Sequence, residues 1–178
     1  MKRTTLAVLA AVAFTMAMAV PAAAQKSSIG IGAGLTMPMG DYGDADKMGF
    51  HFGAGAKFGL GSAPISLRIE GSYSTTSHDG VDGKFNIMGG MASLVYPIQT
   101  AGSLKPYALF GVGYFNVKET DSDVSESGVG FGGGLGVNFA MSSTNLFVEA
   151  RYVTSKAADV NFGRVPLTVG VSFPLGAK

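Results

Sequence analysis

Two residue types are missing from this sequence altogether, cysteine and tryptophan. The absence of cysteine excludes a disulfide framework, thiol chemistry, cysteine-ligated zinc and a lipid anchor on an N-terminal cysteine. Charged residues are scarce, at 14% of the chain, and the formal net charge is only +1. Because nucleic-acid-binding proteins present a strongly basic surface, we expect no nucleic-acid partner.

Long hydrophobic runs are also missing, except at the N-terminus. No later apolar run approaches the ~20 residues that a membrane-spanning helix needs. The first 24 residues combine a basic start, an apolar centre over 6–20 and a run of small residues before Gln25. This is the pattern of a secretory signal peptide, and the alternative is a helix retained as an anchor. We predict a signal peptide over 1–24 and one exported domain over 25–178.

Glycine, in contrast, is abundant, with 27 residues, and much of it alternates with apolar side chains. The clearest case is the stretch GFHFGAGAKFGL at 49–60, where Phe50, Phe52 and Phe58 occupy alternate positions. A period of two places these rings on one face of a β-strand and the intervening glycines on the other. About a dozen residues is also the length of a tilted strand that crosses a hydrocarbon layer.

Eight segments show this alternation, and together they predict an all-β protein. The segments are 28–37, 49–60, 65–74, 85–96, 106–117, 129–139, 146–153 and 165–173. Four long polar loops, 38–48, 75–84, 118–128 and 154–164, alternate with three shorter turns. Such asymmetry is typical of outer-membrane barrels. The sequence therefore predicts an eight-stranded antiparallel up-and-down transmembrane β-barrel with both termini on the periplasmic side.

The orientation of the strands follows from the glycine-rich faces. An alternating strand also fits a soluble sandwich or a lipocalin-like cup, in which the apolar face points inward. In the segments 28–37, 49–60 and 129–139 the opposite face is mostly glycine, which is too poor in polar groups for a water-facing surface. A narrow lumen needs such short residues beside long ones. We expect apolar side chains outward; the less decided segment 85–96 is assigned Met88, Ala92, Leu94 and Tyr96 as its outward set.

Four motifs carry a family resemblance: GLTMPMGDYG at 34–43, PYALFGVGYF at 106–115, LFVEARY at 146–152 and VPLTVGVSF at 165–173. In this order behind a signal peptide, they resemble the small outer-membrane β-barrel proteins of Gram-negative bacteria, the OmpA/OmpX-like group. The resemblance covers the whole predicted mature chain. It implies a monomer in the cell outer membrane, in contact with lipid and lipopolysaccharide, with an extracellular ligand possible at the long loops.

A charged cluster in the lumen is the candidate site. The segments 65–74 and 146–153 stand opposite each other in a ring of eight, and both run outward from a short turn. Arg68 and Glu149 are the fourth residues of their segments, and Glu70 and Arg151 the sixth. We therefore expect opposite charges to meet at two levels across the lumen, with Lys57 of the neighbouring strand joining them. An inert plug is the favoured interpretation, and a gate or proton-sensitive constriction is the alternative.

Two histidines are the other candidates for chemistry. His51 falls on the inward face near the outer rim, and His78 stands between Ser77 and Asp79 in a loop. A nucleophile and its base must be held in a fixed constellation, which neighbours along one loop do not provide by themselves. We therefore expect no enzyme, no catalytic residue and no cofactor.

The acidic loop at 118–128 is the one candidate for a cation site. Glu119, Asp121, Asp123 and Glu126 lack the spacing and the glycine pivot of an EF-hand. A solvated loop near lipopolysaccharide phosphates is the favoured interpretation, so we expect no metal centre. The predicted function is a non-enzymatic structural or surface-interaction protein with a side-chain-filled lumen. The alternative is a narrow porin-like channel for small solutes.

Overall fold

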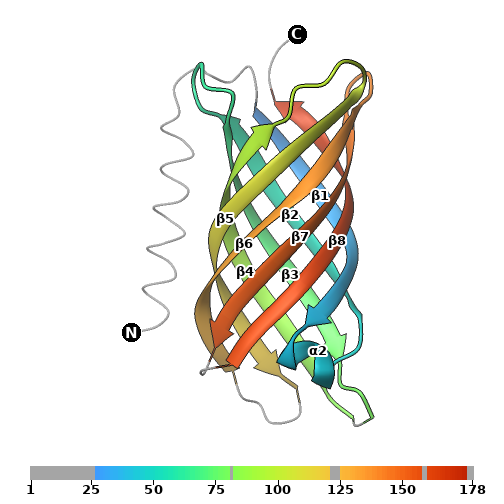
Figure 1. The fold of residues 1–178 in the computed structure, drawn as a ribbon, viewed down its shortest axis with the longest axis vertical. Helices are drawn as coiled ribbons and strands as arrows, with labels where there is room; N and C mark the ends of the chain where they lie inside the picture. The colour runs from blue at the N-terminus through green and yellow to red at the C-terminus, as the bar shows by residue number, and fades with distance from the viewer. Residues whose placement is uncertain (1–26, 81, 121–124, 158–159, 176–178) are drawn as a thin grey trace.

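Eight β-strands follow one another along the described chain and form a single closed barrel (Figure 1). The computed structural model describes residues 27–80, 82–120, 125–157 and 160–175, so the predicted signal peptide lies outside the described residues. The elements are β1 (Ser27–Met39), α2 (Asp41–Ala45), β2 (Gly49–Gly59), β3 (Ser66–Ser77), β4 (Lys84–Pro97), β5 (Leu104–Glu119), β6 (Ser125–Ala140), β7 (Asn145–Ala157) and β8 (Val160–Leu175). Within these ranges, no helix has the length and hydropathy to cross a membrane.

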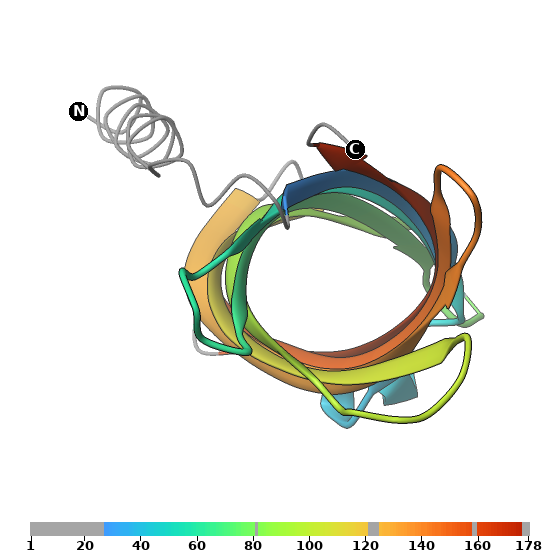
Figure 2. The ribbon, with the colours of Figure 1, turned by 90° about the horizontal axis from the view of Figure 1, so that it is seen from above.

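Every strand pairs antiparallel with its sequence neighbours, and β8 returns to pair with β1. Ile31 of β1, for example, lies opposite Val171 of β8 on one side and Ala54 of β2 on the other. Seen from above, the strands form a complete ring (Figure 2). Closure leaves no strand edge with unpaired backbone groups, which is the condition for a sheet to exist within lipid. The predicted fold is confirmed.

Large apolar side chains cover the outside of the barrel. Phe52 is 60% exposed and Phe131 is 54% exposed, although both lie in the middle of well-paired strands. In β4, Met88 and Leu94 are exposed while Ile87, on the alternate face, is buried, so the predicted outward set is confirmed. A closed barrel with an outward apolar band matches the arrangement of transmembrane barrels.

Inside, glycine makes room for a few large side chains. The Phe147 ring lies against the wall of β1 and β8, where a Cβ added to Gly32 would come within 3.2 Å of the ring and one added to Gly170 would meet it too. Gly136 in the same way leaves space for the Tyr107 ring. Because the interior is close-packed, an alanine at these glycine positions would place its methyl group in the volume that the ring occupies. The glycine faces are therefore the inner wall against which aromatic and charged residues pack.

Two apolar clusters fill the two halves of the lumen. One contains Tyr42, Ile87, Met91, Phe115, Val117, Val153 and Phe162, and the other contains Val95, Tyr107 and Leu109. Two charged side chains of β7 contact a member of each cluster, Arg151 with Met91 and Glu149 with Tyr107. The candidate site thus lies between two apolar layers, where charges are costly unless they are paired.

The predicted loop lengths are partly wrong, because several strands extend into them. The sequence predicts a long loop over 154–164, yet β7 continues to Ala157 and β8 begins at Val160. The ladder persists through Ser155 opposite Phe162, and both of these side chains are buried. The alternation continues past the apolar band there, so backbone pairing continues with it. Likewise β3 reaches Ser77 and β5 reaches Glu119.

Arginine placed on the outer face provides a depth-dependent test of the band. Val112 lies in the middle of β5 and Phe139 next to the end of β6, and both point outward. We expect Val112→Arg to lower the free energy of unfolding by about 2–4 kcal/mol and Phe139→Arg by about 0–1 kcal/mol, because the cost depends on depth in the hydrocarbon. Urea unfolding from phospholipid vesicles measures both. Equal costs at the two positions would contradict the outward assignment of this band.

Candidate functional site

A salt bridge across the lumen joins opposite walls of the barrel. Arg68 of β3 donates from Nη1 to Glu149 Oε2 at 2.8 Å and from Nη2 to Glu149 Oε1 at 3.0 Å. This is the two-pronged geometry that makes arginine–carboxylate pairs strong and directional. The Glu149 side chain is 1% exposed, so its charge has little water to solvate it. The structure brings these two predicted site residues into direct contact.

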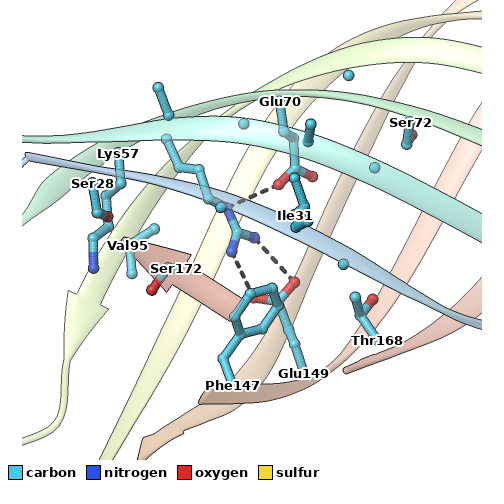
Figure 3. Close-up of a pocket in the computed structure, with 18 of the residues that line it drawn as sticks. Ser28, Ile31, Lys57, Glu70, Ser72, Val95, Phe147, Glu149, Thr168 and Ser172 are labelled. Carbon is cyan, nitrogen blue, oxygen red and sulfur yellow. Dashed lines mark hydrogen bonds and ion pairs between the residues drawn. The ribbon is translucent and has the colours of Figure 1, made fainter. Parts of the chain in front are cut away.

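The second level of charge is formed by Arg151 and Glu70, which are also hydrogen-bonded to each other. The two levels are linked, since Arg68 Nε lies 2.9 Å from Glu70 Oε2 and Arg151 Nε lies 2.8 Å from Glu149 Oε1. Each guanidinium therefore contacts both carboxylates, as Figure 3 shows for the one between Glu70 and Glu149. We call Arg68, Glu70, Glu149 and Arg151 the charge square. Its two positive and two negative charges cancel.

Tyr107 completes the square and was missed by the sequence analysis. Its hydroxyl donates to Glu149 Oε2 at 2.7 Å, from a ring that is almost fully buried. The Glu149 carboxylate thus accepts hydrogen bonds from Tyr107 as well as from Arg68. These bonds satisfy its two buried oxygens, which would be costly to leave unpaired. The signal was present in the sequence, since Tyr107 shares its alternation with the inward Leu109 and faces Gly136 across the ladder.

Lys57, the fifth residue of the predicted cluster, lies beside the square without entering it. It stands opposite Arg68 in the β2–β3 register, and both side chains line the same cavity. In the described ranges, no ion pair or hydrogen bond of the Lys57 side chain is found, whereas each carboxylate of the square already contacts two arginines. The structure therefore groups four of the five predicted residues and leaves Lys57 adjacent to them.

A cavity of about 90 Å³ runs beside the charge square. One wall is formed by glycines of β1 and β2, among them Gly30, Gly32 and Gly55. This space has room for several water molecules and is polar enough to hold them. Polar residues such as Ser28, Ser72, Thr168 and Ser172 border it (Figure 3).

His51 lies in the lumen, as predicted, between two threonine hydroxyls. Its Nδ1 is 3.1 Å from Thr36 Oγ1 and its Nε2 is 2.9 Å from Thr168 Oγ1. Both ring nitrogens are thereby occupied, and neither hydrogen-bonds to a carboxylate. The arrangement ties β1, β2 and β8 together beside the cavity, and among the described contacts no carboxylate orients the ring as the third member of a catalytic triad would.

The short helix α2 lies at the rim of one mouth of the barrel, against β1 and β8, where the sequence analysis placed a polar loop. Gly40 enters this short helix with a φ of 63°, a conformation that favours glycine. Tyr42 is then only 3% exposed and packs edge-on against Phe162 and Phe85, with centroids 5.2 Å and 5.9 Å away. Burial raises the pKa of Tyr42 to about 12. The apolar layer at this end holds the Tyr42 ring and so stabilises α2 at the rim of the barrel (Figure 1).

A hydrogen-bonded chain anchors α2 to the barrel rim. The Tyr42 hydroxyl lies 2.6 Å from Thr76 Oγ1, which in turn donates to Asp46 Oδ1 at 3.2 Å. Asp46 Oδ1 also lies 3.1 Å from His78 Nδ1, and burial raises the pKa of the Asp46 carboxyl. Ser77 and Asp79 do not join His78 in a catalytic arrangement, because Asp79 pairs instead with Lys47 at 2.9 Å.

Arg164 is a buried cation that the sequence analysis left in a loop. The extension of β8 places it inside the barrel, where Nη1 donates to Ser155 Oγ at 3.2 Å and to the Phe162 carbonyl at 3.4 Å. Its guanidinium lies 4.6 Å from the centroid of the Phe115 ring, a favourable cation–π distance. Arg164 therefore supports the layer under α2.

The acidic loop cannot be assembled into a site from the described residues. Asp121 and Asp123 lie outside them, and Glu119 lies 3.7 Å from His78 Nε2. Among the residues that are described, no group of three or more histidines and carboxylates is arranged to hold a metal ion.

Comparison with known families decides the assignment of this barrel. Residues 7–173 match the family described as outer membrane protein beta-barrel domain. The chain belongs to this family. It is an integral outer-membrane β-barrel protein, and its location is the outer membrane. No curated protein gives a significant match to the sequence.

Solved outer-membrane barrels share the fold at low sequence identity. Neisserial surface protein A is 20% identical, with a TM-score of 0.63, over 83% of this chain and 96% of that one. The attachment invasion locus protein Ail of Yersinia pestis is 23% identical, with a TM-score of 0.50, over 84% and 99%. A major outer membrane protein of Thermus thermophilus is 13% identical, with a TM-score of 0.60, over 83% and 98%. These similarities extend over nearly the whole of each related barrel.

A double-mutant cycle tests the pairing in this outer-membrane barrel. We expect Arg68→Ala alone to cost about 3–5 kcal/mol of unfolding free energy, because it leaves Glu149 buried with too little positive charge. The double variant with Glu149→Ala should cost less than Arg68→Ala alone, since Glu70 and Arg151 then remain as a neutral pair. Urea unfolding measures each variant.

The matched control combines Arg68→Ala with Glu126→Ala, since Glu126 is exposed on β6 and makes no contact with the square. That combination should be additive within about 0.5 kcal/mol. Additivity for Arg68 and Glu149 as well would show that the two side chains do not stabilise each other.

Alkaline titration tests the burial of Tyr42. Its folded pKa of about 12 exceeds the ordinary value of 10.0. Its contribution to stability is therefore complete below pH 10 and is lost as the pH rises toward 12. Tyr42→Phe removes this ionisation, so the variant should lose less stability than the wild type between pH 10 and 12. The difference in tyrosinate absorbance between the two proteins gives the Tyr42 pKa directly, and a midpoint near 10 would contradict a buried hydroxyl.

Proposed function

We propose that this outer-membrane barrel is a non-enzymatic protein that supports the envelope and presents one end for surface interactions. The observation that carries the proposal is the salt bridge from Arg68 to Glu149 across the lumen. Fixed side chains on opposite walls occupy the cross-section where a solute pathway would run. Apolar layers on both sides of the charge square, one of which contains the Tyr42 ring of α2, add to the obstruction.

We further propose that the α2 end faces the exterior and that both ends of the strand series face the periplasm. The start of β1 and the end of β8 lie together at the end opposite α2 (Figure 1). The longest connection between described strands separates β1 from β2 and contains α2. Longer connections are typically extracellular in barrels of this class, which supports this orientation.

The exterior partners that we propose are lipopolysaccharide and an extracellular ligand bound by the α2 end of a monomer. Exposed charges of both signs gather there, including Lys47 and Asp79, which pair with each other, and Lys84. Lysine side chains can pair with lipopolysaccharide phosphates, and carboxylates can contact the divalent ions that bridge those phosphates. Ail, which has the same fold, has been crystallised in complex with the heparin analogue sucrose octasulfate, so such a barrel can bind an external anionic sugar.

One observation favours the second candidate function, a narrow channel. The cavity beside the charge square follows a wall of glycines, which leaves part of the lumen free of side chains. This space does not reach the mouth at the α2 end. Solutes could pass only if α2 and the apolar layer beneath it moved aside.

Conductance across a planar bilayer separates the two functions. We expect the purified mature barrel to show no steady single-channel current. The double variant Arg68→Ala and Glu149→Ala removes the salt bridge across the lumen while leaving a neutral pair, and it should pass brief bursts of current whenever the apolar layer at the α2 end opens. Leu104→Ala, an exposed change at the rim of β5, serves as the control that should stay closed. A steady current in the wild type, altered by replacing Arg68, would favour the channel instead.

A further inference from the structure

The cavity beside the charge square is lined by one cation that the square does not balance. Within the square, Arg68 and Arg151 are matched by Glu70 and Glu149. Lys57 is a third cation on the same cavity, and none of the described carboxylates lies within ion-pair distance of it. Its neighbour in the register is Arg68, which carries the same sign. The region around Lys57 therefore has an excess of one positive charge.

The surroundings of Lys57 offer neutral donors, and the two carboxylates that line the same cavity, Glu70 and Glu149, are already paired with arginines. Ser28 stands opposite Lys57 in the β1–β2 register, and Ser172 of β8 is opposite the next inward residue of β1, Gly30. Both hydroxyls line the cavity together with the amide of Asn138. Figure 3 shows Lys57 and Ser28 side by side, with Ser172 across the space.

Physical chemistry requires a counter-charge for such a group. A cation removed from bulk water is costly unless an anion or several hydrogen bonds compensate it. The oxygens of Glu70 and Glu149 are already shared between two guanidinium groups, so neither carboxylate can turn to Lys57 without losing an arginine. Like-charge repulsion from Arg68 adds to the cost. An anion from solution is the remaining source of compensation.

We propose that the Lys57 end of this cavity, on the side of the charge square away from α2, binds one small inorganic oxyanion of the phosphate type. The Lys57 ammonium supplies the charge, and the hydroxyls of Ser28 and Ser172 and the Asn138 amide supply donors around a tetrahedral ion. The volume of about 90 Å³ accepts an ion of this size together with water. The site goes beyond the proposed function, because it holds whether the barrel conducts or is closed.

Several donors arranged around a point charge favour an oxyanion over chloride. A tetrahedral ion has oxygens that can accept from the ammonium, the hydroxyls and the amide at once. A lysine also suits this role better than an arginine, because its ammonium is a compact point charge with three donors.

Isothermal titration of the full mature barrel with sodium phosphate tests the proposal. The protein is held in a maltoside detergent, which contains no phosphate group that could occupy the site. We expect one saturable site in the wild type, with Lys57→Met weakening it by about tenfold or more. Lys105→Met is the matched control, because Lys105 is an exposed lysine of β5 at the same end of the barrel and does not line the cavity. It should bind phosphate as the wild type does.

Further arms separate the site from general attraction of anions. Lys57→Arg, which keeps the charge, and Ser172→Ala, which removes one donor, provide two folded alternatives if Lys57→Met does not refold. Lys57→Arg should retain binding and Ser172→Ala should weaken it. Acetate and chloride should compete weakly, since they cannot use all the donors. Equal phosphate affinity in the wild type and in Lys57→Met, or no saturable binding to the wild type, would overturn the proposal.

Discussion

Hydrogen bonding between β1 and β8 is the constraint on which the rest of this structure depends. A strand within hydrocarbon has no water to satisfy its N–H and C=O groups, so the sheet must close on itself. Thirteen register pairs, from Ser27 opposite Leu175 to Met39 opposite Gly163, make that closure. Once the ring is closed, each residue has one of two positions, toward lipid or toward the lumen.

The composition of the lumen follows from the small size of the ring. Eight strands enclose only enough space for side chains to fill. Glycines on β1, β6 and β8 make room for Phe147, Tyr107 and Arg151. A Cβ atom at these glycine positions would overlap the three side chains. Polar atoms in that space need partners within the protein. The two arginines and two carboxylates of the charge square provide them, together with the Tyr107 hydroxyl.

Alternation made most of the barrel predictable from the sequence. The period of two identified all eight strands and the outward side of each, because lipid and lumen demand opposite chemistry on successive residues. Strand order then placed Arg68 opposite Glu149. In an up-and-down barrel, position along the sequence fixes position around the ring, so this cross-lumen contact follows from strand order and alternation alone.

Features that depend on packing at the mouth were not predictable in the same way. The fold of α2 depends on the burial of one ring, Tyr42, against Phe85 and Phe162, and no periodic signal in the five residues 41–45 announces it. Arg164 enters the lumen because β8 continues beyond the apolar band, where the hydrophobic pattern no longer marks a strand. Lys57 faces the lumen beside Arg68, as the alternation predicts. Alternation alone, however, does not show which side chains Lys57 contacts there.

The central claim, that a band of exposed apolar side chains faces lipid while small polar residues, paired charges and two packed apolar clusters face the lumen, is measurable residue by residue. The chain has no cysteine, so single cysteines can carry nitroxide labels at Phe52 and Val169, on the outside, and at Ser72 and Thr168, on the cavity wall. In bilayers, the labels at Phe52 and Val169 should collide more with oxygen than with a water-soluble nickel chelate. Those at Ser72 and Thr168 should collide little with either, because the filled lumen admits neither lipid nor the chelate. Lipid exposure at Ser72 and Thr168 would contradict the account.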